Sequence, residues 1–169
     1  MTLFIRTAFT IVFSFFSPSL FAGELVKPSG QVILTVMGNI DQTNQTGGKA
    51  EFNRSMIEKI GLRKRQTTTP WTEGVAVFEG VLVKDLLDCV GAKGTNLKIT
   101  ALNDYSANMP LTDLNKYDVI LAMKQDGERL RIRGKGPIFV VYPFNEFPEL
   151  NSEIIYNRSV WQVASITVE

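Results

Sequence analysis

Residues 117–142 read YDVILAMKQDGERLRIRGKGPIFVVY, and this stretch decides the fold class. Two β-prone runs, Tyr117–Lys124 and Glu128–Arg133, flank the dipeptide Asp126-Gly127. An Asp-Gly dipeptide between two such runs is the strongest short-range signal for a β-hairpin. The next run, Pro137–Tyr142, is almost continuously apolar, which is typical of a buried central strand. The stretch therefore predicts a hairpin followed by a central strand.

Similar patterns extend outward in both directions. Strands are predicted at Gln31–Met37, Arg63–Thr69, Val75–Phe78, Asn96–Leu102 and Ser159–Val168. Helical spacing of apolar residues predicts short helices at Ala50–Ile60 and at 83–90, the second closed by Gly91. Residues 103–114, with a brief helical turn at 112–114, and 143–157 are predicted to be irregular. About seven strands with two short helices indicate a single α+β domain that is mainly β.

The composition excludes most familiar enzyme chemistry. The 169 residues include 18 basic and 17 acidic side chains, one cysteine and no histidine. Without histidine there is no Ser-His-Asp triad, no Cys-His pair and no histidine metal site. One thiol cannot form an internal disulfide, and a net charge of +1 argues against a nucleic-acid partner.

The amino end has the layout of a secretory signal peptide. Arg6 precedes the apolar run Ala8–Phe16, Pro18 interrupts it, and Ala22 is a small residue at the expected cleavage site. A membrane anchor would need roughly 20 continuous apolar residues. We therefore expect residues 1–22 to be removed and residues 23–169 to form an exported domain. In such a domain we expect the single Cys89 to be a buried packing residue.

Three segments place polar and aromatic residues where predicted strands end. They are Thr67–Trp71, Asn103–Ser106 and Arg158–Gln162. A fourth segment, Arg131–Pro137, is basic and glycine-rich and resembles an anion-binding nest. Loops at strand ends commonly carry binding residues. Each segment also has a purely structural interpretation, as a turn-capping aspartate, a core tryptophan or a solvated turn.

Together these residue types suit a flat heterocycle. Asp104 could accept two parallel hydrogen bonds from an amidine-like edge. Aromatic faces of Tyr105, Trp71 and Trp161 could stack on the ring. Arg158 could meet carbonyl or phosphate oxygens. The pattern alone leaves open whether these side chains converge.

Trp71–Val168 resembles the molybdopterin-binding domain of the sulfite-oxidase superfamily. The matching motifs are FEGVLVKDLL (78–87), ALNDYS (101–106), ILA with DG (120–122, 126–127), GPIFVVYP (136–143) and RSVWQ (158–162). The resemblance implies that catalytic members hold molybdenum through a cysteine in the extended segment before the first small helix of the match. Here that segment, Arg63–Trp71, offers only Thr67, Thr68 or Thr69, and Cys89 lies beyond the helix. A hydroxyl is a poor substitute for a soft thiolate.

The motif Asn103-Asp104-Tyr105 is similar to that of one branch of this superfamily, small periplasmic pterin-binding regulators of the PruR type. This resemblance implies a non-catalytic protein that binds a reduced pterin and has no obligatory cofactor or metal. It also implies a partner, the periplasmic domain of an inner-membrane diguanylate cyclase or phosphodiesterase, and a role in cyclic di-GMP signalling and biofilm regulation.

In that interpretation Asp104 anchors the pterin, and Trp161 and Tyr105 form stacking walls. Arg158 and Arg133 meet oxygens of the ligand. Trp71 and Thr69 close the pocket.

Two other functions remain compatible with the sequence. One is a molybdopterin-dependent oxidoreductase domain with a non-cysteine metal environment. The other is an interaction module in which the pocket has lost its ligand.

Overall fold

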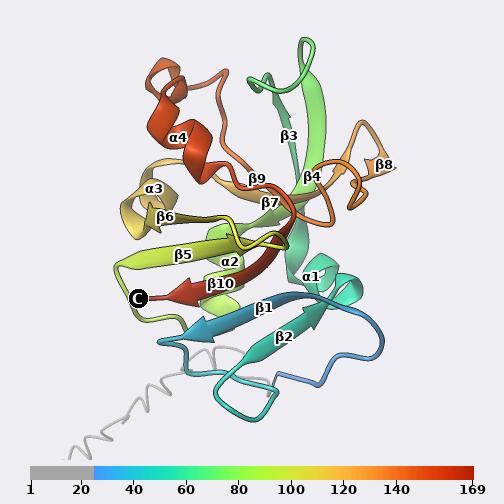
Figure 1. The fold of residues 1–169 in the computed structure, drawn as a ribbon, viewed down its shortest axis with the longest axis vertical. Coiled ribbons are helices and arrows are strands. Elements are labelled where there is room, and N and C mark those ends of the chain that lie inside the picture. The colour runs from blue at the N-terminus through green and yellow to red at the C-terminus, as the bar shows by residue number, and fades with distance from the viewer. Residues whose placement is uncertain (1–24) are drawn as a thin grey trace, which may run out of the picture.

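The computed structural model describes residues 25–169, and the expected signal peptide at 1–22 lies outside them. The described chain forms two sheets with a few short helices (Figure 1). In chain order the elements are β1 (Val32–Gly38), β2 (Ala50–Asn53), α1 (Arg54–Gly61), β3 (Leu62–Thr67), β4 (Ala76–Leu82), α2 (Val83–Cys89), β5 (Asn96–Ala101), β6 (Ser106–Pro110), α3 (Leu111–Lys116), β7 (Ile120–Gln125), β8 (Glu128–Arg129), β9 (Phe139–Val141), the 3-10 helix η1 (Pro148–Leu150), α4 (Glu153–Arg158) and β10 (Val163–Val168). The prediction of a mainly β, α+β fold is confirmed.

The two sheets differ in how they are assembled. The first has the order β2-β1-β10-β5-β6, and its only parallel pair is β1 with β10. The second has the order β3-β4-β7-β8, with β9 also paired to β7. Asp126-Gly127 joins β7 to β8, which confirms the predicted hairpin, although β8 ends at Arg129 and the predicted strand Glu128–Arg133 is wrong beyond that residue. The long β3–β4 pair extends beyond the rest of its sheet (Figure 1).

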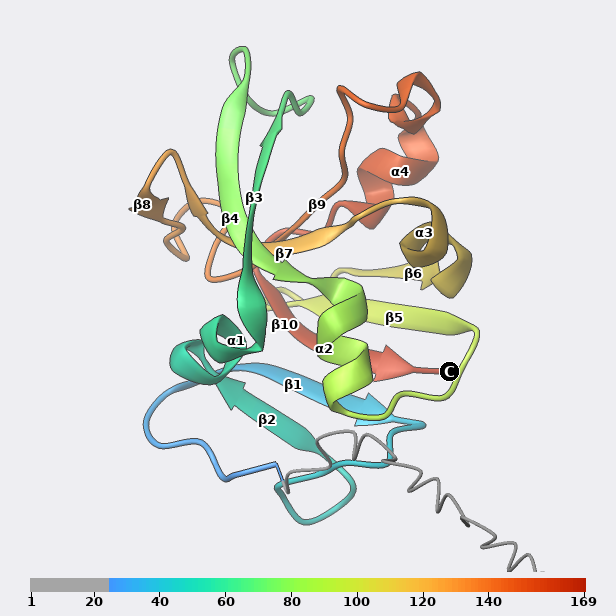
Figure 2. The ribbon, with the colours of Figure 1, turned by 180° about the vertical axis from the view of Figure 1, so that it is seen from behind.

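The main core lies between the sheets and α2. Val83, Leu86 and Leu87 of α2 pack into one buried cluster with residues of both sheets. Figure 2, the view from behind, shows α2 lying across the first sheet. A smaller cluster covers the other face of the second sheet, where Phe78 and Phe139 are buried and Trp71 packs against them. Since β7 is buried on both faces, its apolar residues are continuous rather than alternating.

Several predicted boundaries are wrong, and each error has a local cause. Residues 50–53 pair with β1 instead of beginning the helix, and α1 starts after Asn53, whose side chain accepts a hydrogen bond from the Met56 amide at 3.0 Å. Residues 106–110 form β6, and the predicted loop at 143–157 contains η1 and α4. These elements depend on tertiary partners, which a periodicity pattern does not reveal.

The predicted central strand is buried, but it is not flanked by two strands. β9 pairs with β7 on one side. On the other side Val140 donates to the Val160 carbonyl, and Val163 donates to the Ile138 carbonyl, both at 3.0 Å. These two bonds tie the start of β10 to the second sheet. Residues 159–162 are therefore a connecting segment rather than the beginning of a strand.

Cys89 is exposed at the end of α2, so the prediction of a buried packing residue is wrong. The helix turns its Val83, Leu86 and Leu87 face to the core, and Cys89 lies off that face. Partial desolvation nevertheless raises the pKa of its thiol. Within residues 25–169, no helix has the length and apolar character needed to cross a membrane.

Candidate functional site

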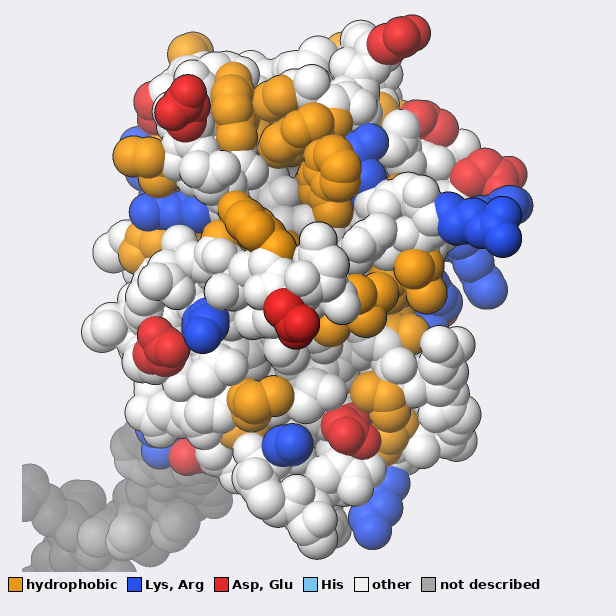
Figure 3. Space-filling view, viewed as in Figure 1, with side chains coloured by type: hydrophobic (Ala, Val, Ile, Leu, Met, Phe, Trp, Pro, Cys, Tyr) orange, Lys and Arg blue, Asp and Glu red, His pale blue; other side chains and the backbone are white. Residues whose placement is uncertain are grey.

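Four aromatic rings meet edge to face where β9, α4 and the β3–β4 tip come together. The Trp71 ring centroid lies 5.4 Å from Trp161, 5.9 Å from Phe139 and 5.9 Å from Tyr156. Phe139 is fully buried, whereas Trp161 is 38% exposed. In Figure 3, which has the view of Figure 1, hydrophobic side chains gather in the upper part of the molecule, next to a basic side chain. The structure thus brings the two predicted tryptophans together and leaves part of one indole accessible.

Lys135 adds a positive charge to this cluster. Its Nζ lies 5.2 Å from the centroid of the Trp161 ring and donates a 3.4 Å hydrogen bond to the Trp71 carbonyl. A cation at this distance is attracted by the indole face. Lys135 is a site residue that the sequence interpretation did not assign, although it lies in the basic segment singled out there.

The predicted anion-binding nest is not formed by this basic segment. The amides of Gly134 and Gly136 both donate to the Arg131 carbonyl, at 2.9 and 3.0 Å, so they are used inside the turn. The Gln162 side-chain amide donates to the carbonyls of Ile132 and Gly134. The two glycine amides are therefore not available to an anion, and the segment presents carbonyls to Gln162.

Asn103, Asp104 and Tyr105 form the exposed turn between β5 and β6. Asp104 has a φ of 65°, a left-handed conformation that aspartate and asparagine tolerate better than most residues. The Asn103 side chain accepts a hydrogen bond from the Tyr105 amide at 3.2 Å. The turn chemistry of the Asn-Asp-Tyr motif is therefore visible in the fold, and the Asp104 carboxylate is left exposed to solvent.

This turn is attached to the segment that carries Trp161. The Leu102 amide donates to the Gln162 carbonyl at 2.9 Å, and the Tyr105 hydroxyl donates to the Asn157 carbonyl at 3.0 Å. Gln162 directly follows Trp161, so the turn bearing Asp104 is attached to the backbone of the segment that carries the accessible indole. The Tyr105 ring remains 46% exposed.

Arg158 is engaged in a partly buried network of hydrogen bonds, and its side chain is 24% exposed. Its Nη1 lies 3.0 Å from an oxygen of Asp113, and its Nε donates to the Asn108 carbonyl at 3.2 Å. The same Asp113 oxygen accepts a 2.8 Å hydrogen bond from Tyr142. Burial, followed by the Asp113 charge, raises the pKa of Tyr142 far above its usual range. These contacts hold α4 against β6 and α3.

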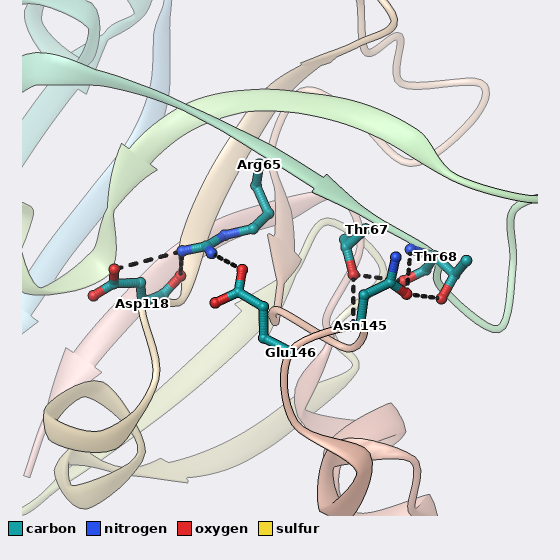
Figure 4. A network of polar contacts seen from close by, with 6 residues as sticks. All are labelled: Arg65, Thr67, Thr68, Asp118, Asn145 and Glu146. Atoms are coloured by element: carbon teal, nitrogen blue, oxygen red, sulfur yellow. Dashed lines mark hydrogen bonds and ion pairs between the residues drawn. The ribbon is translucent and has the colours of Figure 1, made fainter.

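Thr67, Thr68 and Thr69 occupy the segment in which the resemblance would place a molybdenum-bound cysteine. The Thr67 hydroxyl donates to the Thr68 carbonyl and accepts from the Asn145 amide (Figure 4). The Thr68 hydroxyl donates to the Asn145 side chain. The Thr69 hydroxyl pairs with that of Thr72 and accepts from the Trp71 amide.

An arginine fixes this segment from the other side. Arg65 on β3 contacts the Glu146 carboxylate, the Asp118 carbonyl at 3.1 Å and the Asp118 carboxylate at 3.6 Å (Figure 4). Residues 143–147 are thereby held against β3. With every threonine hydroxyl engaged and no thiolate in the segment, this donor set does not fit a molybdenum centre.

The structure thus separates the predicted residues into two groups. Trp71 and Trp161 are in contact, with Lys135 beside them, and the Asn103–Tyr105 turn is hydrogen-bonded to the segment that carries Trp161. Arg158 and Thr69 make structural contacts, and Arg133 is exposed in the turn that precedes Lys135.

A cleft of about 1230 Å³ lies elsewhere, between β1, α1 and the β8 region, and none of the eight predicted site residues lines it. We base the candidate site on the aromatic contacts, because they join residues from three segments that are distant in sequence.

The chain is similar to a known family and to solved structures. The family described as "Oxidoreductase molybdopterin binding domain" matches residues 42–146, more than half of the chain. Among solved structures, the sulfane dehydrogenase SoxCD from Paracoccus pantotrophus is similar with a TM-score of 0.59 and 19% identity. The similarity covers 80% of this chain and 37% of that chain, and at this identity it concerns the fold. No curated protein sequence matches the chain.

Proposed function

Because the chain belongs to the family of oxidoreductase molybdopterin-binding domains, we propose that it retains a pterin-recognition surface and acts as a non-catalytic pterin receptor. One observation carries the proposal. Trp161 packs edge to face against Trp71 and Phe139, is partly exposed, and lies beside Lys135 in a segment hydrogen-bonded to the turn that bears Asp104. A flat, fused heterocycle with N–H donors on one edge and a carbonyl on the other complements this set of groups.

Each group has a distinct part in binding. The exposed Trp161 face stacks on the pterin ring, with Tyr105 as the second aromatic wall. Asp104 accepts hydrogen bonds from the pterin 2-amino and N3–H groups. Lys135 and Arg133 meet the ring carbonyl or oxygens of its side chain. Arg158, Thr69 and Trp71 act indirectly, by fixing α4 and the turn against which Trp161 packs.

The absence of a fitting metal donor set supports binding without redox chemistry. The family name implies molybdopterin, but the threonine segment offers no thiolate, and its hydroxyls are hydrogen-bonded to Asn145 and Thr72. Within residues 25–169, no group of three or more Asp, Glu and Cys side chains is arranged to hold a metal ion. A receptor that binds a metal-free reduced pterin is consistent with these features.

The sequence resemblance extends the proposal to location and partner. With residues 1–22 as a signal peptide, the receptor works in the periplasm. It relays its ligand state to the periplasmic domain of an inner-membrane diguanylate cyclase or phosphodiesterase, as the PruR-type regulators do.

Calorimetric titration with tetrahydrobiopterin tests the proposal. We expect Trp161→Leu to abolish most of the binding, because it removes the stacking face. Asp104→Asn keeps the left-handed turn and removes only the charge, and we expect it to weaken binding about tenfold. The matched control is Asp88→Asn, which changes an exposed aspartate on α2 that is paired with Lys84. Equal affinity of wild type, Trp161→Leu and Asp104→Asn would refute the assignment.

Elemental analysis of protein from a molybdenum-competent host separates the receptor from the oxidoreductase. Stoichiometric molybdenum would favour the enzyme. Metal-free protein that binds tetrahydrobiopterin would support the receptor.

A further inference from the structure

A second surface is the cleft between β1, α1 and the β8 region. None of the four aromatic residues of the cluster described above lines it. Its volume is about 1230 Å³, and its walls include Val32–Thr35, Arg54, and residues 127–132. Small-molecule pockets usually enclose roughly 300–1,000 Å³ and cover most of their ligand. A larger, open cleft suits a polypeptide segment better than a compact ligand.

The cleft collects exposed apolar side chains. Four of the large hydrophobic residues that remain exposed in residues 25–169 line it, coming from four different segments: Val32, Leu62, Leu102 and Ile132. Their exposed fractions run from 37% for Val32 to 54% for Ile132. Figure 3 shows hydrophobic side chains below the β8 region, next to basic ones at the edge of the molecule. Apolar side chains gathered in one concave surface mark an interaction site more often than scattered ones do.

One wall of the cleft is an unpaired strand edge. β1 pairs with β2 along one side from Val32 onward. On its other side the ladder with β10 begins only at Thr35 and Ser165, so Val32 and Ile33 extend beyond it. On this second side no strand among residues 25–169 pairs with Val32 or Ile33, whereas on the first side Val32 pairs with Asn53 and the register shifts between Val32 and Leu34. An exposed edge offers backbone groups to an added extended strand.

The cleft has an excess of positive charge. Arg54, Arg129 and Arg131 line it, against Glu58 and Glu128, and a fourth basic residue, Lys124, is paired with Glu79 at 3.4 Å. The Nη1 atom of Arg54 is buried and has no hydrogen-bond partner within the described chain. Burial lowers the pKa of Arg54, Arg129 lowers it further, and Glu58 partly offsets this. A buried guanidinium nitrogen without an acceptor is costly unless an acceptor is supplied.

We propose that this cleft docks an extended, apolar and acidic segment of another polypeptide, which adds as a strand along Val32 and Ile33. Alternate side chains of the segment lie against Leu62, Leu102 and Ile132, while its carboxylates pair with Arg54 and Arg129. The proposal uses no residue of the pterin surface and does not depend on pterin binding.

A short synthetic peptide in which glutamate alternates with valine is the probe, and the same peptide with lysine in place of glutamate is its control. Binding to the purified protein is measured by fluorescence anisotropy. We expect the acidic peptide to bind and the basic one not to bind. We expect Arg54→Gln to weaken binding about tenfold or more, because it removes one charge-assisted contact. We expect Ile132→Asp to weaken binding by a similar factor, because it replaces an apolar contact by a carboxylate that repels the acidic peptide. Ile154→Asp, an equally exposed isoleucine on α4 outside the cleft, is the matched control and should bind like wild type.

Amide exchange of Val32 and Ile33 reports strand addition directly, and both should become protected when the acidic peptide binds. The proposal is overturned if both peptides bind equally, if neither binds, or if Ile154→Asp weakens binding as much as Ile132→Asp. It is also overturned if glutarate alone binds with the same affinity as the peptide and the same dependence on Arg54, since the cleft would then be a small-anion site. Self-association that Ile132→Asp abolishes would assign the cleft to a second copy instead.

Discussion

Replacement of Asp113 by alanine tests whether the network around Arg158 fixes the fold beneath the candidate site. Asp113 is 9% exposed and accepts hydrogen bonds from the Tyr142 hydroxyl at 2.8 Å and from Arg158 at 3.0 Å. Removing the carboxylate leaves the fully buried Tyr142 hydroxyl without this acceptor, which costs about 1–3 kcal/mol. Loss of the partly exposed ion pair adds about 1 kcal/mol. We therefore expect Asp113→Ala to lower the free energy of unfolding by about 3 kcal/mol.

The assay is urea denaturation followed by tryptophan fluorescence. The double variant Asp113→Ala/Tyr142→Phe removes the unsatisfied hydroxyl and should regain about 1–3 kcal/mol relative to Asp113→Ala alone. Asp118→Ala is the control, because that side chain is 72% exposed, and it should change stability by less than about 0.5 kcal/mol. If Asp113→Ala is as stable as Asp118→Ala, the network does not support α4. Arg158 would then be available to a ligand, as the sequence interpretation expected.

Three further predictions address pH, capping and the thiol. The pKa of the Tyr142 hydroxyl is raised in the folded state, so the neutral phenol contributes its full stabilisation below about pH 10. Above that pH the free energy of unfolding should fall by about 1.4 kcal/mol per pH unit, because the unfolded chain loses this proton first. Tyr142→Phe should show a smaller loss of stability at alkaline pH in pH-dependent denaturation. Asn53→Ala removes the N-cap of α1 and should lower the free energy of unfolding, measured by thermal denaturation, by about 1 kcal/mol. Asn53→Asp should keep most of the wild-type stability, because a carboxylate can also accept from the Met56 amide. Equal losses in the two variants would show that this cap does not account for the loss of stability. Cys89 should react with a disulfide reagent in the folded protein, slowly at pH 7 and faster as the pH rises, because its pKa is raised; protection until unfolding would contradict its exposed position.

The candidate site was only partly predictable from the sequence. Aromatic residues that follow strand ends predict Trp71, Tyr105 and Trp161 as binding residues, and the structure places the two tryptophans in contact. Arg158 and Thr69 were predicted for the same reason, yet both are used in hydrogen bonds that hold the fold. Residue type indicates what a side chain can do, while its neighbours decide whether its donors remain free.

The fold, like the candidate site, was only partly predictable from the sequence. The Asp126-Gly127 hairpin and the helix α2 follow from local turn chemistry and apolar spacing, which are present in the sequence itself. The strand at 50–53 and the edge position of β9 follow from pairing with distant strands, so no local pattern encodes them. Cys89 is a similar case, because the outward position of one helical residue depends on which side of α2 meets the sheets.

Local sequence thus determined the turns, the mainly β class, the absence of histidine chemistry and the set of aromatic and acidic side chains available for binding. Only the tertiary structure decided that Trp161 remains accessible beside Lys135, and that Arg54, whose buried Nη1 has no hydrogen-bond partner within residues 25–169, lines a cleft beside a strand edge. The physical reason is that turn preferences act between neighbouring residues, whereas exposure and hydrogen-bond satisfaction depend on segments that the fold brings together from far along the chain.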